Sequence, residues 1–235
     1  MPRPVPAVMA SMTNRGAAAE SPAEHYRWRQ TEHWVRLFSE HLGGMFGLQV
    51  GGRRLSAHVR DRLALSRMYL MRAAGAGDLH ADVASVPLAT ESMALVVLPW
   101  TLDHCADFEP VLAETDRVLM PEGCLLVFGT RPVSPWSSRL PRRPPAAAVL
   151  RRRLAQAGYD VLAHRRLLYR PPVSSERWLQ RLAPLDRMGG WHMAWLAGGF
   201  ALLARKRVIA MTPVGVRWNR PVRELAGDVV TGGTG

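Results

Sequence analysis

The sequence predicts an α/β fold built on a mostly parallel β-sheet. Two uninterrupted apolar runs, residues 93–98 and 124–129, have the composition of strands that are buried on both faces. Between them, apolar side chains recur at helical spacing over residues 111–119. A strand, a helix and a second strand of these lengths form a βαβ unit, whose strands are parallel and whose crossover is right-handed.

The composition is that of one globular domain. The chain has 235 residues, of which 48% are hydrophobic and 21% are charged, so a useful hydrophobic core can form. The net charge is +12, and Lys206 is the only lysine. Arginine presents a planar fork that suits phosphate, so this charge favours anionic partners such as nucleic acid or a membrane surface. The alternative interpretation is a solvated basic surface, because a GC-rich coding sequence favours arginine over lysine.

The amino-terminal helix has a clear start. Ser21 is a suitable N-cap, Pro22 takes the first helical position, and Glu24 completes a capping box. Apolar side chains then follow at helical spacing, and Gly43 with Gly44 is expected to end the helix.

The next elements are shorter. Residues 45–50 form a candidate first strand that ends at a Gly-Gly pair, and alternation predicts a second strand near residues 67–71. Asp107 is expected to cap the helix of the βαβ unit, with Pro110 tolerated in its first turn. Residues 121–123, Pro-Glu-Gly, are expected to form a turn.

The remaining chain alternates loops with regular elements. We expect a helix that Gly158 ends, then two further strands, a proline-rich loop and a surface insertion with some helix. The ranges are helix 146–157, strands 159–169 and 200–207, loop 131–145 and insertion 171–190, with helix near 175–182.

The domain limits and the compartment follow from composition. Residues 1–20 are expected to be a disordered leader, 21–207 the domain and 208–235 a flexible tail. Cys105 and Cys124 lie in apolar runs without metal-ligand spacing, so no metal site is expected and free thiols point to a reducing cytoplasm. The sequence shows no secretory signal and no apolar run near the ~20 residues of a membrane span.

Residues 82–129 contain short motifs in a fixed order. An aspartate precedes a Val-Pro pair, a polar loop leads to an apolar strand and Leu-Asp-His, and a helix closes on Glu-x-x-Arg-Val-Leu-x-Pro-x-Gly. These motifs are Asp82, residues 86–87, residues 93–104 and residues 114–123. The stretch resembles the second half of a class I S-adenosylmethionine-dependent methyltransferase of the type 11 family. Residues 48–51, 132–136 and 204–207 are also similar to a small bacterial subgroup, the YafS-like proteins.

The resemblance implies a doubly wound, Rossmann-like sheet with an antiparallel last strand. S-adenosylmethionine would bind outside the carboxyl ends of the strands, at the point where the strand order reverses. Glycines there would allow close backbone approach, and an aspartate would accept a hydrogen bond from the adenine amino group. The implied cofactor-binding residues are Gly51, Gly52, Asp82, Val83, Pro99, Trp100 and Thr101.

Two further residues occupy positions where some relatives have an acid or a base. These are Asp103 and His104, and an imidazole has a suitable ordinary pKa for a base. Purely structural roles are the alternative: Asp82 as a turn residue, Trp100 as part of the core, and Asp103 and His104 as loop residues.

The first half departs from the family pattern. An acidic residue followed by Gly-x-Gly-x-Gly is typical, whereas this chain has Gln49-Val50-Gly51-Gly52-Arg53. Arg72 stands where an acid would bind the ribose hydroxyls, and Asp78 is a weak substitute. Because the span from Gly51 to Asp82 is short for two βα units, one helix is expected to be shortened or lost.

The leading hypothesis is therefore an S-adenosylmethionine-dependent methyltransferase acting on an unidentified acceptor. A catalytically inactive methyltransferase-like scaffold that binds a partner is the second hypothesis, because the glycine motif is incomplete. An RNA-associated protein is the third, since arginines cluster at residues 139–143 and 151–153 without any RNA-binding motif.

Overall fold

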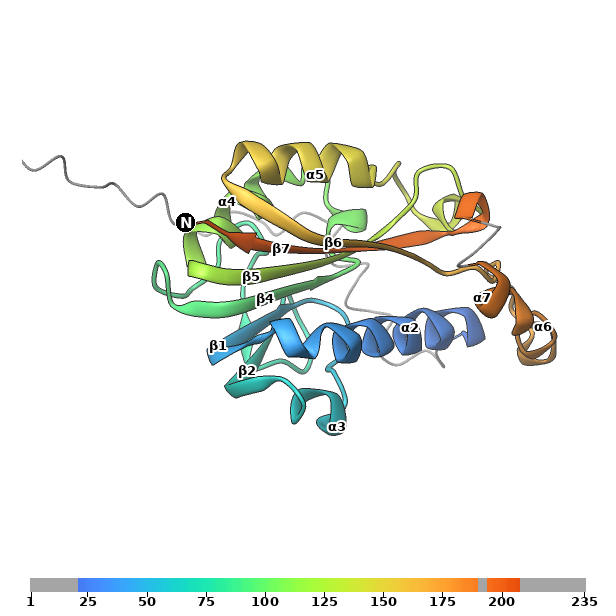
Figure 1. Cartoon of the computed structure of the whole chain (residues 1–235), viewed down its shortest axis with the longest axis horizontal. Coiled ribbons are helices and arrows are strands. Elements are labelled where there is room, and N and C mark those ends of the chain that lie inside the picture. Colours follow the sequence, from blue (N-terminus) through green and yellow to red (C-terminus); the bar gives the residue numbers. More distant parts are fainter. Residues whose placement is uncertain (1–20, 190–193, 208–235) are drawn as a thin grey trace, which may run out of the picture.

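The computed structural model describes residues 21–189 and 194–207. The expected leader (1–20) and tail (208–235) lie outside the described residues, as do residues 190–193. The described chain forms one seven-stranded sheet with helices against both of its faces (Figure 1). The predicted α/β class is therefore confirmed.

The strand order is β3-β2-β1-β4-β5-β7-β6. Neighbouring strands are parallel except where β7 pairs with β5 and β6. This confirms the doubly wound, mostly parallel sheet, and it confirms the parallel pairing of residues 93–98 with 124–129. The strands are β1 Gly43–Val50, β2 Ala64–Arg72, β3 Leu79–His80, β4 Met93–Pro99, β5 Leu119–Thr130, β6 Tyr159–Leu167 and β7 Gly199–Lys206.

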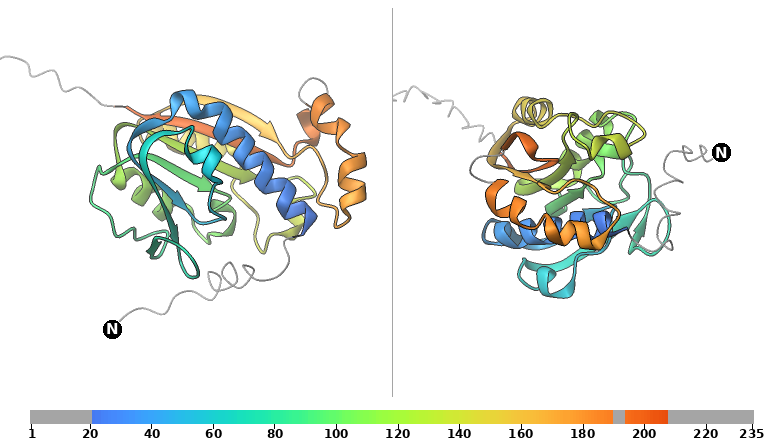
Figure 2. Two further views of the ribbon diagram at one scale, coloured as in Figure 1. Left: turned by 90° about the horizontal axis from the view of Figure 1, so that it is seen from below. Right: turned by 90° about the vertical axis from the view of Figure 1, so that its right-hand side faces the viewer.

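Helices cover the two faces of the sheet unequally. α2 and the short α3 lie against one face, while α4 and α5 lie against the other (Figure 1). α6 and α7 extend beyond the carboxyl end of β6 (Figure 2). The helices are α2 Pro22–Phe38, α3 Ala57–Arg60, α4 Glu109–Val118, α5 Ala147–Gln156, α6 Glu176–Arg181 and α7 Pro184–Gly189. Short 3-10 turns are η2 Ser39–His41, η3 Leu102–His104, η4 Ser137–Arg139 and η5 Ala194–Leu196.

Helix α2 begins as predicted and ends earlier. The Ser21 hydroxyl accepts a hydrogen bond from the Glu24 amide at 3.3 Å, as an N-cap does. The helix stops at Phe38, so the expectation that Gly43 and Gly44 end it was wrong. Both glycines belong to β1, and a Cβ atom on Gly44 would collide with the Cβ of Ala94 on β4. Close strand packing, and not helix termination, therefore accounts for this glycine.

The expected turn at residues 121–123 lies inside β5. The pairing register between β4 and β5 shifts from Met93↔Leu119 to Leu95↔Cys124, so β5 contains extra residues at this point. Glu122 has a φ of 61°, which breaks the regular strand conformation. The Pro-Glu-Gly segment is therefore a bulge within one long strand, and the separate turn was wrong.

The first half of the sheet is reduced further than expected. Only the four-residue α3 connects β1 to β2, and no helix occurs among residues 73–78 between β2 and β3. Residues 81–92, which lead from β3 to β4, are also without a helix. The prediction of one shortened or lost helix is confirmed and extends to neighbouring connections.

Candidate functional site

Two glycines turn the chain sharply at the carboxyl end of β1. Gly51 and Gly52 have φ values of 77° and 68°, a region that glycine enters without steric cost. A Cβ atom on Gly52 would lie 3.1 Å from both the Pro99 side chain and the Trp28 ring. The predicted glycine turn is therefore packed between α2 and the end of β4.

Gln49 organises this turn from the position where the family pattern has an acid. Its buried side chain donates hydrogen bonds to the carbonyl groups of Gly51 and Arg53. Its amide oxygen accepts a hydrogen bond from the Leu55 backbone at 3.2 Å. An ionised carboxylate accepts but cannot donate, so an amide suits this turn. The sequence showed that the acid was missing, but not this role of the amide.

The end of β4 is fixed to both neighbouring elements. The Trp100 ring is buried, and its N–H donates to the Thr31 hydroxyl of α2 at 2.9 Å. The Thr101 hydroxyl donates to the Val50 carbonyl at 2.5 Å, which links the ends of β4 and β1. Trp100 also packs near Phe128, with ring centroids 6.1 Å apart. The structure thus places Trp100 in the core, the alternative that the sequence left open.

Asp103 is buried in the turn that follows. Its carboxylate accepts hydrogen bonds from the Thr130 amide at 3.0 and 3.1 Å and from the Thr130 hydroxyl at 2.5 Å. Burial raises the pKa of Asp103 to about 6, although the Thr130 hydrogen bonds and the charge of Arg27 oppose this rise. Asp103 links η3 to the end of β5, and the adjacent His104 is partly exposed.

Asp82 lies at the end of β3 and close to this turn. Its side chain is exposed, and Oδ1 accepts a hydrogen bond from the Ala84 amide at 2.9 Å. In the part of the chain that the structure describes, Oδ2 accepts no hydrogen bond. Burial together with the charges of Asp82, Asp103 and Asp107 raises the pKa of the Cys105 thiol to about 11. The loop after β3 therefore comes near Cys105 in the loop after β4, and Val83 is half-buried beside Asp82.

The position expected to bind ribose is already engaged. Asp78 accepts hydrogen bonds from the Leu70 amide at 2.7 Å and from the Arg54 guanidinium at 2.8 Å. These partners hold the pKa of Asp78 below its ordinary value, with the Arg54 hydrogen bond as the largest cause. The Arg72 guanidinium donates a hydrogen bond to the Ala76 carbonyl at 3.4 Å. As an arginine it offers no acceptor for the ribose hydroxyl groups. At this end of the site, Asp78 is therefore paired with Arg54, and both side chains remain partly exposed.

The loop between β3 and β4 is held by the Glu-x-x-Arg motif. The Arg117 guanidinium donates to the carbonyl groups of Val86 and Leu88, each at 2.9 Å. It also pairs with Glu114 at 2.7 Å, and Glu114 accepts a hydrogen bond from the Val86 amide. The motif was recognised in the sequence, but its function as support for the Asp82 loop required the structure.

Part of the chain matches a known family. Residues 59–127 match the family described as methyltransferase domain, of type 11. A segment of 109 residues is 32% identical to the uncharacterised protein YafS of Escherichia coli (strain K12). This match covers 45% of the present chain and 42% of YafS, so the shared part is less than half of either protein.

Solved structures share the fold at low sequence identity. A methyltransferase from Archaeoglobus fulgidus that is described as SAM-dependent aligns with a TM-score of 0.57 at 13% identity, over 78% of this chain and 97% of that chain. Geranyl diphosphate methyltransferase, solved in complex with SAM, aligns with a TM-score of 0.55 at 14% identity, over 77% of this chain and 87% of that chain. The [4+2]-cyclase SpnF aligns with a TM-score of 0.56 at 19% identity, over 77% of this chain and 83% of that chain. These likenesses show the fold.

Within residues 21–189 and 194–207, His, Cys, Asp and Glu side chains form no group of three that could hold a metal ion. In the same part of the chain, every helix is too short or too polar to cross a membrane.

Proposed function

We propose that this chain, a member of the type 11 family of class I methyltransferases by its matched segment and its fold, binds S-adenosylmethionine and transfers its methyl group to an acceptor. The main support is the shared position of three segments that the resemblance implies for the cofactor site. The Gly51-Gly52 turn, Asp82 and the Pro99–Thr101 segment all lie at the carboxyl ends of parallel strands, β1, β3 and β4, and therefore at the same end of the sheet. In a doubly wound sheet this is the switch point at which ligands bind.

The residues at this point fit the cofactor at two of its three parts. Asp82 would accept from the adenine amino group through Oδ2, and the Gly51-Gly52 backbone would lie along the methionine part. The Trp28 ring packs against Gly52 through Cζ3 and Cη2 and forms one wall beside this turn.

The ribose part fits less well. No carboxylate at the end of β2 is free to accept hydrogen bonds from two hydroxyl groups, because Asp78 is paired with Arg54. Losing one hydrogen bond to a charged group weakens binding by roughly ten- to hundredfold. The site therefore favours weak binding of the cofactor.

In this proposal the protein chiefly binds the cofactor and aligns the acceptor with its methyl group. Bound S-adenosylmethionine supplies an activated methyl group on a sulfonium, so an acceptor needs alignment more than activation. Asp103 is a positioning residue that fixes η3 through Thr130, since its buried carboxylate is not accessible to an acceptor. His104, partly exposed on the same turn, would take a proton from an acceptor that must lose one.

Calorimetric titration with S-adenosylmethionine tests the proposal. The expected dissociation constant is between about 10 μM and 1 mM, which is a micromolar site weakened by the lost ribose contact. Asp82→Ala should weaken binding by roughly tenfold or more. Asp61→Ala is the matched control, because Asp61 is an exposed aspartate in the turn after α3 and away from the site.

Two results would count against the proposal. If folded protein gives no heat at millimolar cofactor, the chain is a methyltransferase-like scaffold. If Asp61→Ala weakens binding as much as Asp82→Ala does, the cofactor lies elsewhere.

For His104, replacement by Gln should lower turnover of a proton-bearing acceptor while the cofactor affinity stays unchanged.

A further inference from the structure

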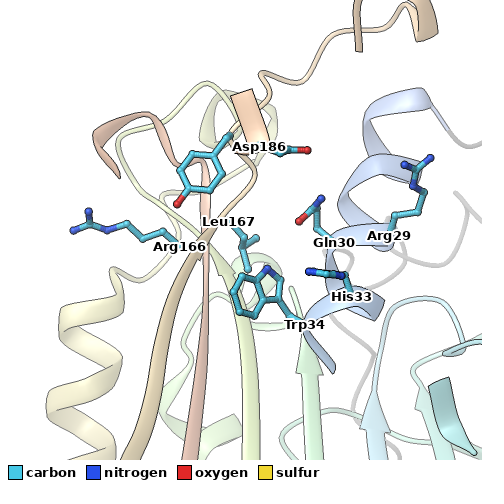
Figure 3. A pocket seen from close by; sticks show the side chains of 8 residues that line it. Arg29, Gln30, His33, Trp34, Arg166, Leu167 and Asp186 are labelled. Carbon is cyan, nitrogen blue, oxygen red and sulfur yellow. The ribbon is translucent and has the colours of Figure 1, made fainter. Parts of the chain in front are cut away.

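A second concave site lies between α2 and the edge strand β6. It has a volume of about 330 Å³, within the range of sites for small ligands or single nucleotides. Gln30, His33 and Trp34 project from α2 into this cleft (Figure 3). Leu167 and Tyr169, from the end of β6 and the residues after it, line the opposite wall.

This cleft is separate from the cofactor site. Trp28 and Glu32 lie on the side of α2 that faces the Gly52 turn and the Ser56 amide. Gln30 and Trp34 lie on the other side of the helix, toward β6. An occupant of the cleft would therefore not compete with the cofactor, and the inference does not depend on the proposed methyl transfer.

Two arginines flank the cleft. Arg29 lies on the outer side of α2, and Arg166 extends from β6 away from α2 (Figure 3). Both are exposed, and neither forms a salt bridge within the described residues. The acid at the cleft, Asp186, is already paired with Arg170 at 2.8 Å and accepts a hydrogen bond from the Tyr26 hydroxyl at 2.6 Å. The rims of the cleft thus keep uncompensated positive charge.

The positive charge continues along the edge of the sheet. β6 is the last strand of the sheet, so its outer side is not covered by another strand. Arg165 is exposed on β6, and Arg151 is exposed on α5 beside it. Burial lowers the pKa of His164, and the charges of Arg151, Arg166 and Arg165 lower it further, so each of these arginines lies near this histidine. The edge of the sheet next to the cleft therefore carries several exposed arginines.

Aromatic side chains give the cleft a second property. The Trp34 ring is half-buried and packs on Phe38, with centroids 5.7 Å apart. The Tyr169 ring is also half-buried. Flat rings inside a cleft with cationic rims match the way proteins bind unpaired bases, which stack on aromatic side chains while the phosphates follow basic groups.

We infer that the cleft between α2 and β6, with its flanking arginines, binds single-stranded nucleic acid. One base would enter the cleft beside Trp34 and Tyr169, and the neighbouring phosphates would contact Arg29 and Arg166. An acidic peptide would satisfy the arginines alone and would leave the aromatic cleft unused, so a nucleic acid chain fits better.

The test is fluorescence anisotropy with a labelled single-stranded RNA of about 12 nucleotides and the full chain without cofactor, at several salt concentrations starting near 50 mM. Wild-type protein should bind, with an affinity that falls as salt rises. Each phosphate contact on a single strand contributes about −0.7 to the slope of log K against log salt. Arg29→Ala/Arg166→Ala should therefore make the slope shallower by about 1.4 and weaken binding by roughly ten- to hundredfold near 50 mM salt.

The matched control is Arg62→Ala/Arg67→Ala. It removes the same charge from exposed positions in and just before β2, on the opposite side of the sheet from β6. This pair should change the affinity little. Equal weakening by both pairs would mean that net charge alone attracts the RNA, and it would overturn the inference.

Further arms test the aromatic cleft and the kind of ligand. Trp34→Leu should weaken binding by roughly five- to hundredfold through lost stacking, with circular dichroism to check the fold. If Trp34→Leu unfolds, Tyr169→Leu answers the same question. No loss in a folded variant would overturn the inference. So would the absence of RNA binding at low salt, or equal competition by polyglutamate or by a free mononucleotide.

Discussion

The carboxyl group of Asp103 shows how burial changes a residue's effect on stability. Its ordinary pKa is 3.8, and burial raises it to about 6 in the folded protein. Between these two values the folded state binds more protons at this site than the unfolded state does. The contribution of Asp103 to stability is therefore fully present below about pH 4 and is lost as the pH rises through 6.

Asp103→Asn removes this titration. Relative to that variant, the free energy of unfolding of the wild type should fall by up to about 1.4 kcal/mol per pH unit between pH 4 and 6, and then level off. Urea unfolding of both proteins at pH 4, 5, 6 and 7 measures the difference. Parallel curves for the two proteins would show that the Asp103 carboxyl is not shifted.

Gly52 and Gly158 illustrate two reasons why a position requires glycine: a positive φ value, and a lack of space for a Cβ atom. Both have positive φ values, 68° and 83°, so alanine at either position should cost about 1 kcal/mol of stability. A Cβ atom at Gly158 meets nothing within 4 Å, whereas one at Gly52 lies 3.1 Å from Pro99 and Trp28. Gly52→Ala should therefore destabilise more and also weaken cofactor binding, while Gly158→Ala should leave binding unchanged. Thermal unfolding and calorimetry check both effects, and equal results for the two variants would contradict this account.

At the scale of single residues, the sequence identified positions better than roles. The Gly51-Gly52 turn and Asp82 lie just after β1 and β3, because their order along parallel strands determines their place, and their contact with a cofactor stays a prediction. The roles of Trp100 and Asp103 depend on Thr31 and Thr130, which are distant in sequence. No local pattern contains such a partner, so core packing and ligand contact could not be separated before the structure was known.

Among the elements, Arg117 supports a loop that has no helix of its own. Residues 81–92 replace a helical connection, and two of their carbonyl groups are bound by the Arg117 guanidinium. Lysine has a single ammonium group and cannot reproduce this planar fork. In Arg117→Lys, the amides of residues 83–90 should exchange hydrogen several-fold faster, and binding through Asp82 should weaken.

Arg153→Lys is the control for this prediction. Arg153 forms an exposed ion pair with Glu109 at 2.7 Å, and such pairs contribute little to stability. Its replacement should leave exchange in residues 83–90 unchanged. Faster exchange in both variants would indicate a general loss of stability instead of a local effect on the loop.

Elements with strong local signals were predictable. The Ser21 N-cap and helical periodicity indicated α2, and the apolar run 93–98 indicated β4, whose seven residues are all buried. The sequence could not predict that residues 121–123 form a bulge in β5, nor that α3 has only four residues. These features depend on how β5 pairs with β4 and on how little chain separates β1 from β2, and neither is a local property.

Across the whole molecule, the two halves of the sheet differ in how well they are covered. Along β2 only Leu70 and Met71 are buried, whereas every residue of β4 is buried. The difference follows from the connections, because helices α4 and α5 pack on the second half while the first half has only the short α3 beside α2. The extent of apolar burial governs how readily a segment opens.

We therefore expect the β2–β3 half to open before the rest of the fold. In native-state hydrogen exchange, amides of β2 should exchange with a lower opening free energy than those of β4, β5 and β7. Those central strands should exchange only by global unfolding, since they lie between two layers of helices. If the site is formed as proposed, saturating S-adenosylmethionine should slow exchange at the two ends of this half, near Gly51 and Asp82, more than in β7. Equal protection of β2 and β4 in the free protein would show that the loss of the connecting helices has no effect on stability.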